Sequence, residues 1–257
     1  MITISIDPVA FTVGPISVRW YGIMIALAAL TVVLWVLREV RKGANISYDT
    51  LFTAALVGIP SAIIVSRLLH VVDMWDYYSQ NPGQIIGGAG LTAYGAILGA
   101  TLGVWVYSKV TKVQFGYIAD VVAPGIILAQ AIGRVGCILN GCCYGLPTSL
   151  PWGIVYTNPS CLAPLGVATH PTALYELIFC LIGFAVLLIL RGRLKPDGSL
   201  FLVYLSLYSL WRLGTDFLRE GTPFLLGLHQ AQVISLVILA IAVPILVYRT
   251  RWVKAGG

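Results

Sequence analysis

The chain of 257 residues is 58% hydrophobic and only 10% charged, whereas soluble domains have about 25% charged residues. This composition, with a mean hydropathy of +0.90, excludes an ordinary soluble domain and predicts an integral membrane protein. Apolar runs of about 20 residues favour membrane helices over the shorter alternating strands of a membrane barrel. The net charge of +6 does not indicate nucleic-acid binding, because membrane topology explains the positions of most basic residues.

Seven transmembrane helices are predicted, which makes the fold class all-α. Residues 1–15 resemble an interfacial lead-in without a secretory signal, so the first helix is expected to direct membrane insertion. The predicted spans cover residues 16–37, 51–72, 85–107, 115–135, 172–190, 199–218 and 230–248. The third carries Gly95, Gly99 and Gly103 on one face, a pattern that lets membrane helices touch. A small outer-face insertion at 136–171 separates the fourth and fifth spans, and we expect one polytopic domain over residues 1–257.

Basic residues predict the orientation of these helices. Clusters after the first, third, fifth and seventh spans contain 11 of the 16 lysines and arginines. All four clusters fall on one side of the membrane, which the positive-inside rule identifies as the cytoplasm. The N-terminus is therefore expected outside and the C-terminus in the cytoplasm, with the 136–171 insertion on the outer face.

Five arginines remain unexplained by topology, and all map to outer helix ends: Arg19, Arg67, Arg134, Arg212 and Arg219. An arginine at membrane depth costs about 2.5–3.5 kcal/mol and needs an anionic partner. The commonest mobile anion in a bilayer is a lipid phosphate. We expect Arg19 and Arg67 to reach toward lipid phosphates or to pair with acids.

The other three arginines differ in their neighbours. Arg212 and Asp216 have the spacing of a local helical ion pair, and with Tyr204 and Tyr208 they form a polar stripe expected to face the bundle interior. Arg134 has no acid within one turn, and Arg219 lies outside the stripe, although the adjacent Glu220 could compete for it. Arg134 and Arg219 are therefore the best candidates for holding a phosphate.

A helix start is predicted at residues 169–172, from a threonine cap and an early proline. Glu176, about one turn further, is expected to be a buried partner for an arginine, with a catalytic acid as the alternative. His170 could either orient its neighbours or transfer a proton, since histidine titrates near neutral pH. His70 and His229 lack comparable neighbours and are expected to be structural.

Four of the five cysteines fall in the outer-face insertion, namely Cys137, Cys142, Cys143 and Cys161. The fifth, Cys180, falls in a predicted span. Two disulfides are the default expectation in an oxidising exterior. A metal site is disfavoured because the adjacent Cys142 and Cys143 lack the usual C-x2-4-C spacing. A thiol nucleophile would need a depressed pKa, and we expect activity not to need a free thiol of the protein.

Five segments in order resemble the prolipoprotein diacylglyceryl transferases, over nearly the whole chain. They are residues 18–22 (VRWYG), 87–95 (GGAGLTAYG), 133–145 (GRVGCILNGCCYG), 170–176 (HPTALYE) and 211–220 (WRLGTDFLRE). The resemblance implies transfer of a diacylglyceryl group from phosphatidylglycerol to the thiol of a lipobox cysteine on exported preproteins, in a bacterial cytoplasmic membrane. It implies no metal or organic cofactor, and we expect a monomer.

The resemblance also implies roles for residues. Arg134 and Arg219 match the essential arginines of the family and are expected to act on the phosphate. The expected substrate-binding residues are Tyr21, Asn140, Gly141, Gly145, Glu176 and Arg212. The third span departs from the usual histidine, since Tyr94 stands there, and tyrosine is a poor base at neutral pH. The general base therefore stays open between Tyr94, His170 and the partly ionised substrate thiol.

Two further departures fall in the signature segment, where Cys137 replaces the usual asparagine and Cys142 the usual glutamate. Two other function classes remain as alternatives. A phospholipid-binding transporter or scaffold would use the same arginines without chemistry, and a membrane thiol oxidoreductase would use Cys142 and Cys143.

Overall fold

The computed structural model describes residues 1–87, 92–219 and 224–253. These form two compact units, residues 1–39 with 119–257 and residues 40–118, which we describe separately and call the larger and the smaller unit. The larger unit contains most of α1 (Trp20–Arg41) and α6 (Phe115–Asn140), and all of α7 (Thr172–Leu190), α8 (Ser199–Thr215), the short helix η1 (Asp216–Leu218) and α9 (Gln230–Arg249). The smaller unit contains α2 (Tyr48–Asp73), α3 (Trp75–Gln80), α4 (Gln84–Gly87) and α5 (Ala93–Thr111).

Within the described residues, five helices are long and apolar enough to cross a membrane: α1, α2, α6, α7 and α9. The other two predicted spans are also helical, but α5 has 19 residues and α8 has 17, and neither belongs to that set. A mainly helical membrane protein is therefore confirmed, whereas the number of seven spans stays a prediction.

The N-terminal lead-in contains strands, and the predicted first span begins too early, because residues 16–19 form a strand and α1 starts at Trp20. Residues 2–19 contain β1 (Ile2–Ile4), β2 (Val9–Val13) and β3 (Ile16–Arg19), and β2 pairs antiparallel with β3. The alternation of apolar and polar residues in this segment is the period of a strand. β1 pairs parallel with β4 (Ile154–Tyr156), which pairs antiparallel with β5 (Ala168–Thr169), so the small sheet joins the N-terminus to the 136–171 insertion.

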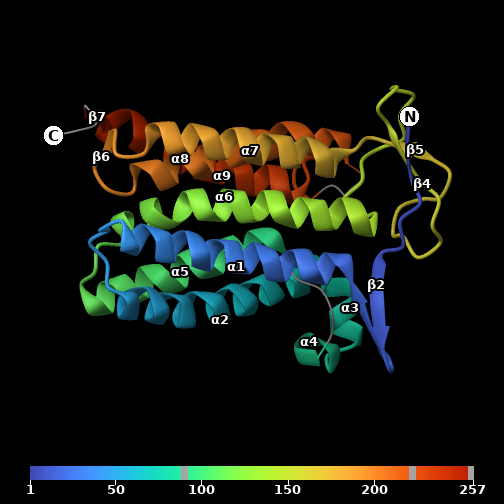
Figure 1. The fold of residues 1–257 in the computed structure, drawn as a ribbon, viewed down its shortest axis with the longest axis horizontal. Helices are drawn as coiled ribbons and strands as arrows, with labels where there is room; N and C mark the ends of the chain where they lie inside the picture. Colours follow the sequence, from blue (N-terminus) through green and yellow to red (C-terminus); the bar gives the residue numbers. More distant parts are fainter. Residues whose placement is uncertain (88–91, 220–223, 254–257) are drawn as a thin grey trace. The chain divides into compact units, whose positions relative to one another are not determined.

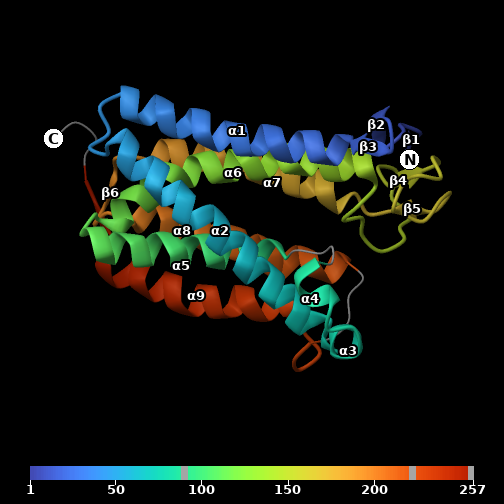
Figure 2. The ribbon, with the colours of Figure 1, turned by 90° about the horizontal axis from the view of Figure 1, so that it is seen from below.

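Basic residues lie at the end of the larger unit opposite to β1, β4 and β5. β6 (Leu194–Lys195) pairs with β7 (Arg251–Trp252), which joins the segments that follow α7 and α9. Arg191 after α7 forms an ion pair with the buried Glu39 near the end of α1. Figures 1 and 2 show β4 and β5 at one end of these helices and β6 at the other. Arg38 near the end of α1 and the described basic residues after α7 and α9 thus share one end of this unit, and the N-terminus and the insertion share the other.

Packing in the larger unit is fixed by a few interlocking contacts. The indole N–H of Trp35 on α1 donates to the Val121 carbonyl on α6 over 2.9 Å. A Cβ added at Gly125 would lie 2.8 Å from that indole, so the two helices approach where α6 has no side chain. Both carboxylate oxygens of Asp120 on α6 accept from the first turn of α8, at 2.8 Å from the Gly198 and Phe201 nitrogens. This carboxylate satisfies N–H groups that the start of a helix leaves unpaired.

In the smaller unit α2 packs against α5. The predicted small-residue face of α5 is confirmed, because Cβ atoms added at Gly95, Gly99 or Gly103 would collide with α2 between residues 61 and 66. Arg67 on α2 donates to the carbonyl of Ile85 over 2.9 Å, and its guanidinium lies 5.1 Å from the Tyr78 ring centroid. Arg67 therefore fastens α4 to α2 within this unit.

Candidate functional site

Glu176, on the second turn of α7, is 1% exposed and lies at the centre of a polar cluster. One carboxylate oxygen lies 2.6 Å from Arg134 Nη2 and accepts from the Tyr208 hydroxyl over 3.1 Å. The other lies 3.4 Å from Arg219 Nη2 and 3.7 Å from Arg212 Nη1. The expectation that Glu176 is a buried partner for an arginine is confirmed, and it serves three arginines.

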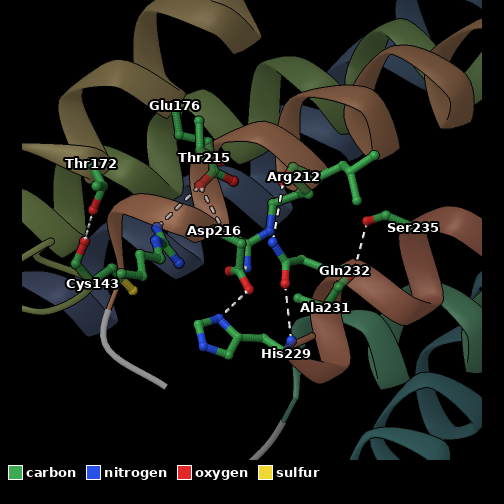
Figure 3. A network of polar contacts seen from close by, with 12 residues as sticks. Cys143, Thr172, Glu176, Arg212, Thr215, Asp216, His229, Ala231, Gln232 and Ser235 are labelled. Atoms are coloured by element: carbon green, nitrogen blue, oxygen red, sulfur yellow. Dashed lines mark hydrogen bonds and ion pairs between the residues drawn. The ribbon is translucent and has the colours of Figure 1, made fainter. Parts of the chain in front are cut away.

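Asp216 is the second carboxylate of the cluster. It lies 3.0 Å from Arg212 Nη2, which confirms the ion pair predicted from their spacing. Figure 3 shows Asp216 between Arg212 and His229, whose Nδ1 lies 2.9 Å from the second carboxylate oxygen. Sequence analysis gave His229 no neighbours and so missed this contact. The Gln232 side chain accepts from the backbone N–H of His229 over 2.9 Å and anchors the start of α9.

Tyr204 and Tyr208 are 0% and 4% exposed, and Arg212 and Asp216 are also buried, so the predicted polar stripe on α8 does face the interior. The stripe presents Tyr208 and Arg212 to Glu176 on α7. Side chains four residues apart lie about one helical turn from each other, so these groups follow one face of the helix.

We call Arg134, Arg212, Arg219, Glu176 and Asp216 the arginine cluster. Three guanidiniums face two carboxylates there, so these five side chains together carry one uncompensated positive charge. Burial, and then the neighbouring Arg212, lowers the pKa of Arg219, whose buried Nε has no hydrogen-bond partner among the described residues. Glu220 lies outside the described residues. A surplus cation with a spare donor is suited to hold an anion such as a phosphate.

Three thiols adjoin the arginine cluster. The Sγ atoms of Cys137, Cys142 and Cys143 all lie within 4.8 Å of one another, and Arg134 Nη1 lies 3.7 Å from Cys137 Sγ. The thiols of Cys137 and Cys142, and after them the Arg134 and Arg219 guanidiniums, hold the pKa of Cys143 below its ordinary value. We call these three residues the thiol triad.

The expectation of two disulfides is wrong, because all five cysteines of the chain are described and all are free thiols. The expectation rested only on the oxidising conditions expected outside the cytoplasm. In the structure three of the four outer-face thiols converge on one place, an arrangement that does not divide into two pairs.

Gly145 joins the segments that carry the site. Its N–H donates to the His170 carbonyl over 2.9 Å, and the next N–H, of Leu146, donates to the Leu218 carbonyl over 2.8 Å. A Cβ at Gly145 would lie 2.8 Å from both His170 Cβ and Thr172 Cγ2. Glycine is therefore required where the start of α7 meets the residue preceding Arg219.

His170 lines a cavity of about 10 Å³ together with Cys142, and its buried Nδ1 has no hydrogen-bond partner among the described residues. A cavity of that size holds about one water molecule. His170 is not among the groups in contact with Glu176, and Thr172, two residues on, donates from its hydroxyl to the Cys143 carbonyl (Figure 3).

The remaining predicted binding residues lie at or near the C-terminal end of α6. Asn140 Oδ1 accepts from Arg19 Nη1 over 3.2 Å, a contact between residues 121 apart that sequence reasoning missed. Gly141 has φ +65°, and a Cβ there would lie 3.0 Å from Cys161 Cβ. Tyr21 packs along Gly136, since a Cβ at Gly136 would lie 3.3 Å from Tyr21 Cα.

Tyr94 belongs to the smaller unit, so its role as a base stays a prediction. It is 8% exposed and lies in the first turn of α5. Thr92 caps this helix by accepting from the Gly95 N–H over 3.2 Å.

Long apolar helices with a surplus of largely buried guanidinium groups define the class of a helical membrane protein with a cationic polar cluster. The family model described as prolipoprotein diacylglyceryl transferase matches residues 8–248, and the chain belongs to this family of transferases.

Relatives named phosphatidylglycerol–prolipoprotein diacylglyceryl transferase cover nearly the full chain. The one from Dehalococcoides mccartyi is 53% identical over 251 residues, which are 98% of this chain and 96% of the relative. The one from Clostridioides difficile is 39% identical over 90% of each chain. The one from Lysinibacillus sphaericus is 36% identical over 99% of this chain and 96% of its own. The resemblance of the five segments is thus confirmed.

Proposed function

We propose that the chain transfers the diacylglyceryl group of phosphatidylglycerol to the lipobox cysteine thiol of exported preproteins in a bacterial cytoplasmic membrane. The names of its relatives support both substrates. The observation that carries the proposal is the arginine cluster, where three buried guanidiniums face two carboxylates and Arg219 keeps an unused donor.

The reaction places new negative charge where this cluster lies. The substrate sulfur, as thiolate, forms a bond to the glyceryl carbon that carries the phosphate. The bond from that carbon to oxygen breaks, its electron pair stays on the phosphate oxygen, and glycerol phosphate leaves. The phosphate changes from a monoanionic diester to a dianionic monoester, so fixed cations beside it stabilise the transition state more than the bound lipid.

Each residue of the cluster has a distinct part in this proposal. Arg134 and Arg219 hold the phosphate oxygens, since each shares only Glu176 as a carboxylate partner among the described residues. Glu176 keeps the guanidiniums together in the absence of lipid. Arg212 is bound to Asp216 as well as near Glu176, and so positions the others. The proton of the substrate thiol passes to a base, Tyr94 or His170, or is already lost to solvent from the partly ionised thiol, and these three alternatives stay open.

The remaining predicted binding residues shape the wall of this site. Gly145 permits the close approach of the α7 start to the segment before Arg219. Asn140 and Gly141 end α6, and Tyr21 packs beside it. We propose that the site faces the outer side, with the N-terminus outside and the C-terminus in the cytoplasm. The pairing of β1 with β4 and of β6 with β7 supports this orientation.

The test is to incubate the purified protein with phosphatidylglycerol and a lipobox peptide and to analyse both products by mass spectrometry. We expect the peptide to gain one diacylglyceryl group for each glycerol phosphate released. A peptide with serine in place of the cysteine is the matched control and should gain nothing. Lipid binding without either product would favour a transporter or scaffold, and a change confined to thiol oxidation would favour an oxidoreductase.

A further inference from the structure

The thiol triad is assembled by the way in which α6 ends. The Gly141 N–H donates to the Ile138 carbonyl over 3.3 Å and the Cys142 N–H donates to the Cys137 carbonyl over 3.0 Å. With Gly141 at φ +65°, this is a Schellman motif, which brings the residue after the glycine back onto the last helical turn. Cys137 and Cys142 are those two residues. The C-x4-C-C spacing therefore folds into one cluster, although it does not resemble a linear metal motif.

Cys143 completes the triad from an uncommon backbone conformation. Its φ is +58°, a left-handed conformation that is strained for a residue other than glycine. Such strain persists where the surrounding structure enforces it, and it accumulates at functional sites. Here the chain turns so that all three sulfurs lie within 4.8 Å of one another.

We propose that the thiol triad binds one thiophilic divalent cation of the zinc group, with three sulfur ligands and an open fourth position. Zinc–sulfur bonds of about 2.3 Å in a tetrahedral site require sulfurs about 3.8 Å apart, so small side-chain rotations suffice. Arg134 Nη1, 3.7 Å from Cys137 Sγ, offsets part of the negative charge of three thiolates. Among the described residues no fourth histidine, cysteine or carboxylate joins the group.

The fourth position is suited to the thiol substrate, an assignment that rests on the proposed function. A zinc site with three protein ligands takes water or substrate at the fourth position, and a coordinating thiol loses its proton. The lipobox thiol would bind there and release its proton to solvent. Its sulfur would then attack the glyceryl carbon, and the electron pair of the carbon–oxygen bond would leave on glycerol phosphate. The uncharged thioether product is a weaker ligand and dissociates, without any change in oxidation state.

The position of the triad supports this role. Arg134 contacts both Cys137 and Glu176, so the sulfur ligands and the proposed phosphate site share a guanidinium. Cys142 also lines the 10 Å³ cavity beside His170, which is large enough for a water at an open coordination position.

Metal binding is tested by an experiment that does not measure diacylglyceryl transfer. The reduced, chelator-treated full-length protein is titrated with Zn²⁺ in detergent, and X-ray absorption counts the ligands. We expect one Zn²⁺ per chain with three sulfurs at about 2.3 Å. Cys142→Ser and Cys143→Ser should weaken binding more than about 100-fold, the upper end of the loss caused by removing an outer-shell partner. The matched controls Cys161→Ser and Cys180→Ser should bind as the unchanged protein does.

A second measurement covers variants that do not fold. In the unchanged protein, bound Zn²⁺ should protect Cys137, Cys142 and Cys143 from alkylation while Cys161 stays reactive, as read from peptide masses. Three results would overturn the metal site. They are a fully reduced protein that binds no stoichiometric Zn²⁺, fewer than three sulfurs around the metal, and a loss of Zn²⁺ affinity in Cys161→Ser as large as in Cys142→Ser and Cys143→Ser.

The role of the fourth position is tested by pH. Near pH 7 the stripped protein should transfer roughly 10²-fold more slowly than the zinc-bound protein, the lower end for loss of a proton-transfer group. Its rate should rise with pH as the substrate thiol ionises near its ordinary pKa of about 8.5, whereas the zinc-bound protein should already be fast below that pH. If the stripped and the zinc-bound proteins had equal transfer rates and equal pH profiles, the fourth position would not be the site of the substrate thiol.

Arg134→Lys separates the two proposals. It should still bind one Zn²⁺ through three sulfurs but transfer far more slowly, because lysine cannot replace the paired guanidinium contacts. A protein that binds Zn²⁺ as expected but transfers nothing from phosphatidylglycerol, with or without metal, would overturn the proposed function and the thiol activation while upholding the metal site.

Discussion

Glu176 is the residue that holds the site together before any lipid is bound. Its carboxylate lies against groups from α6, α8 and the segment after η1, so one buried charge connects three parts of the chain. A buried carboxylate is costly unless it is paired and hydrogen-bonded, and here both oxygens have partners. The same arrangement holds Arg134 and Arg219 at the two oxygens of one carboxylate, which fits the proposal that they bind one phosphate together.

At Arg134 and Arg219, lysine should not substitute. An ammonium is a point charge without the planar fork that binds two phosphate oxygens. Losing one contact made mainly in the transition state should cost about 2.7–4 kcal/mol, or roughly 10²–10³ in rate. Arg212→Lys is the matched control and should lose less, since one ammonium can still reach Asp216. The measurement is transfer from phosphatidylglycerol by folded variants; near-normal rates for the first two and an inactive Arg212→Lys would reverse the assignment.

Glu176→Gln should destabilise the protein and slow transfer. The amide keeps the shape but leaves Asp216 as the sole carboxylate among the described residues to face three guanidiniums. Breaking a buried ion pair from one side costs about 3–5 kcal/mol, which should lower the thermal unfolding midpoint in detergent. Asp197→Asn, which removes a more exposed carboxylate paired with Lys195, is the control and should have little effect. Equal midpoints for both variants would contradict a central role for Glu176.

Among the elements, the ends of the helices matter most for the site. The Schellman end of α6 gathers the thiol triad beside Arg134, and Asp120 near the other end of α6 caps α8, which carries Arg212. The start of α7 is tied to the same region, because the Thr172 hydroxyl donates to the Cys143 carbonyl. Small local motifs at the helix ends thus help to position the long helices that carry the site.

The α2–α5 contact gives a prediction about helix packing. Gly99→Ala should destabilise the smaller unit, because the added Cβ would lie 2.8 Å from Val65 Cβ and 2.9 Å from Ala62 Cα. Overpacking of this kind costs typically about 1–3 kcal/mol. Gly22→Ala on α1 is the matched control, since a Cβ there meets nothing within 4 Å. Thermal unfolding in detergent checks this, and a midpoint unchanged by Gly99→Ala would contradict the tight packing.

At the scale of the whole molecule, orientation in the membrane decides which substrates can reach the site. In the larger unit β1 shares a sheet with two strands of the 136–171 insertion, and the segments after α7 and α9 pair at β6 and β7. These pairings agree with the sidedness that the basic clusters predict. In the proposed function exported preproteins present their lipobox at the outer face, which is where the predicted orientation would place the arginine cluster.

Reporter fusions test this topology directly. A reporter at position 43, 111 or 194 should give a cytoplasmic signal, and one at position 80 or 150 should give an outside signal. The reason is that basic loops stay on the cytoplasmic side during insertion. A cytoplasmic signal at position 150 would place the insertion and the arginine cluster on the wrong side for exported substrates.

Sequence by itself determined the features that depend on composition or on neighbours within one or two turns. Apolar length predicted the membrane helices, and a spacing of four residues predicted both the Arg212–Asp216 pair and the glycine face of α5. The five ordered segments identified the family. These features follow from rules that act locally along the chain, so no tertiary information was needed for them.

Tertiary structure alone decided which distant groups meet. Arg134 and Arg219 reach Glu176 across 42 and 43 residues, and Arg19 reaches Asn140 across 121. The triad of free thiols replaced the expected disulfides, because the turn at Gly141 places Cys142 against Cys137. Such contacts depend on how whole helices pack, and packing depends on the shapes of all their side chains together. Local periodicity carries no information about that choice.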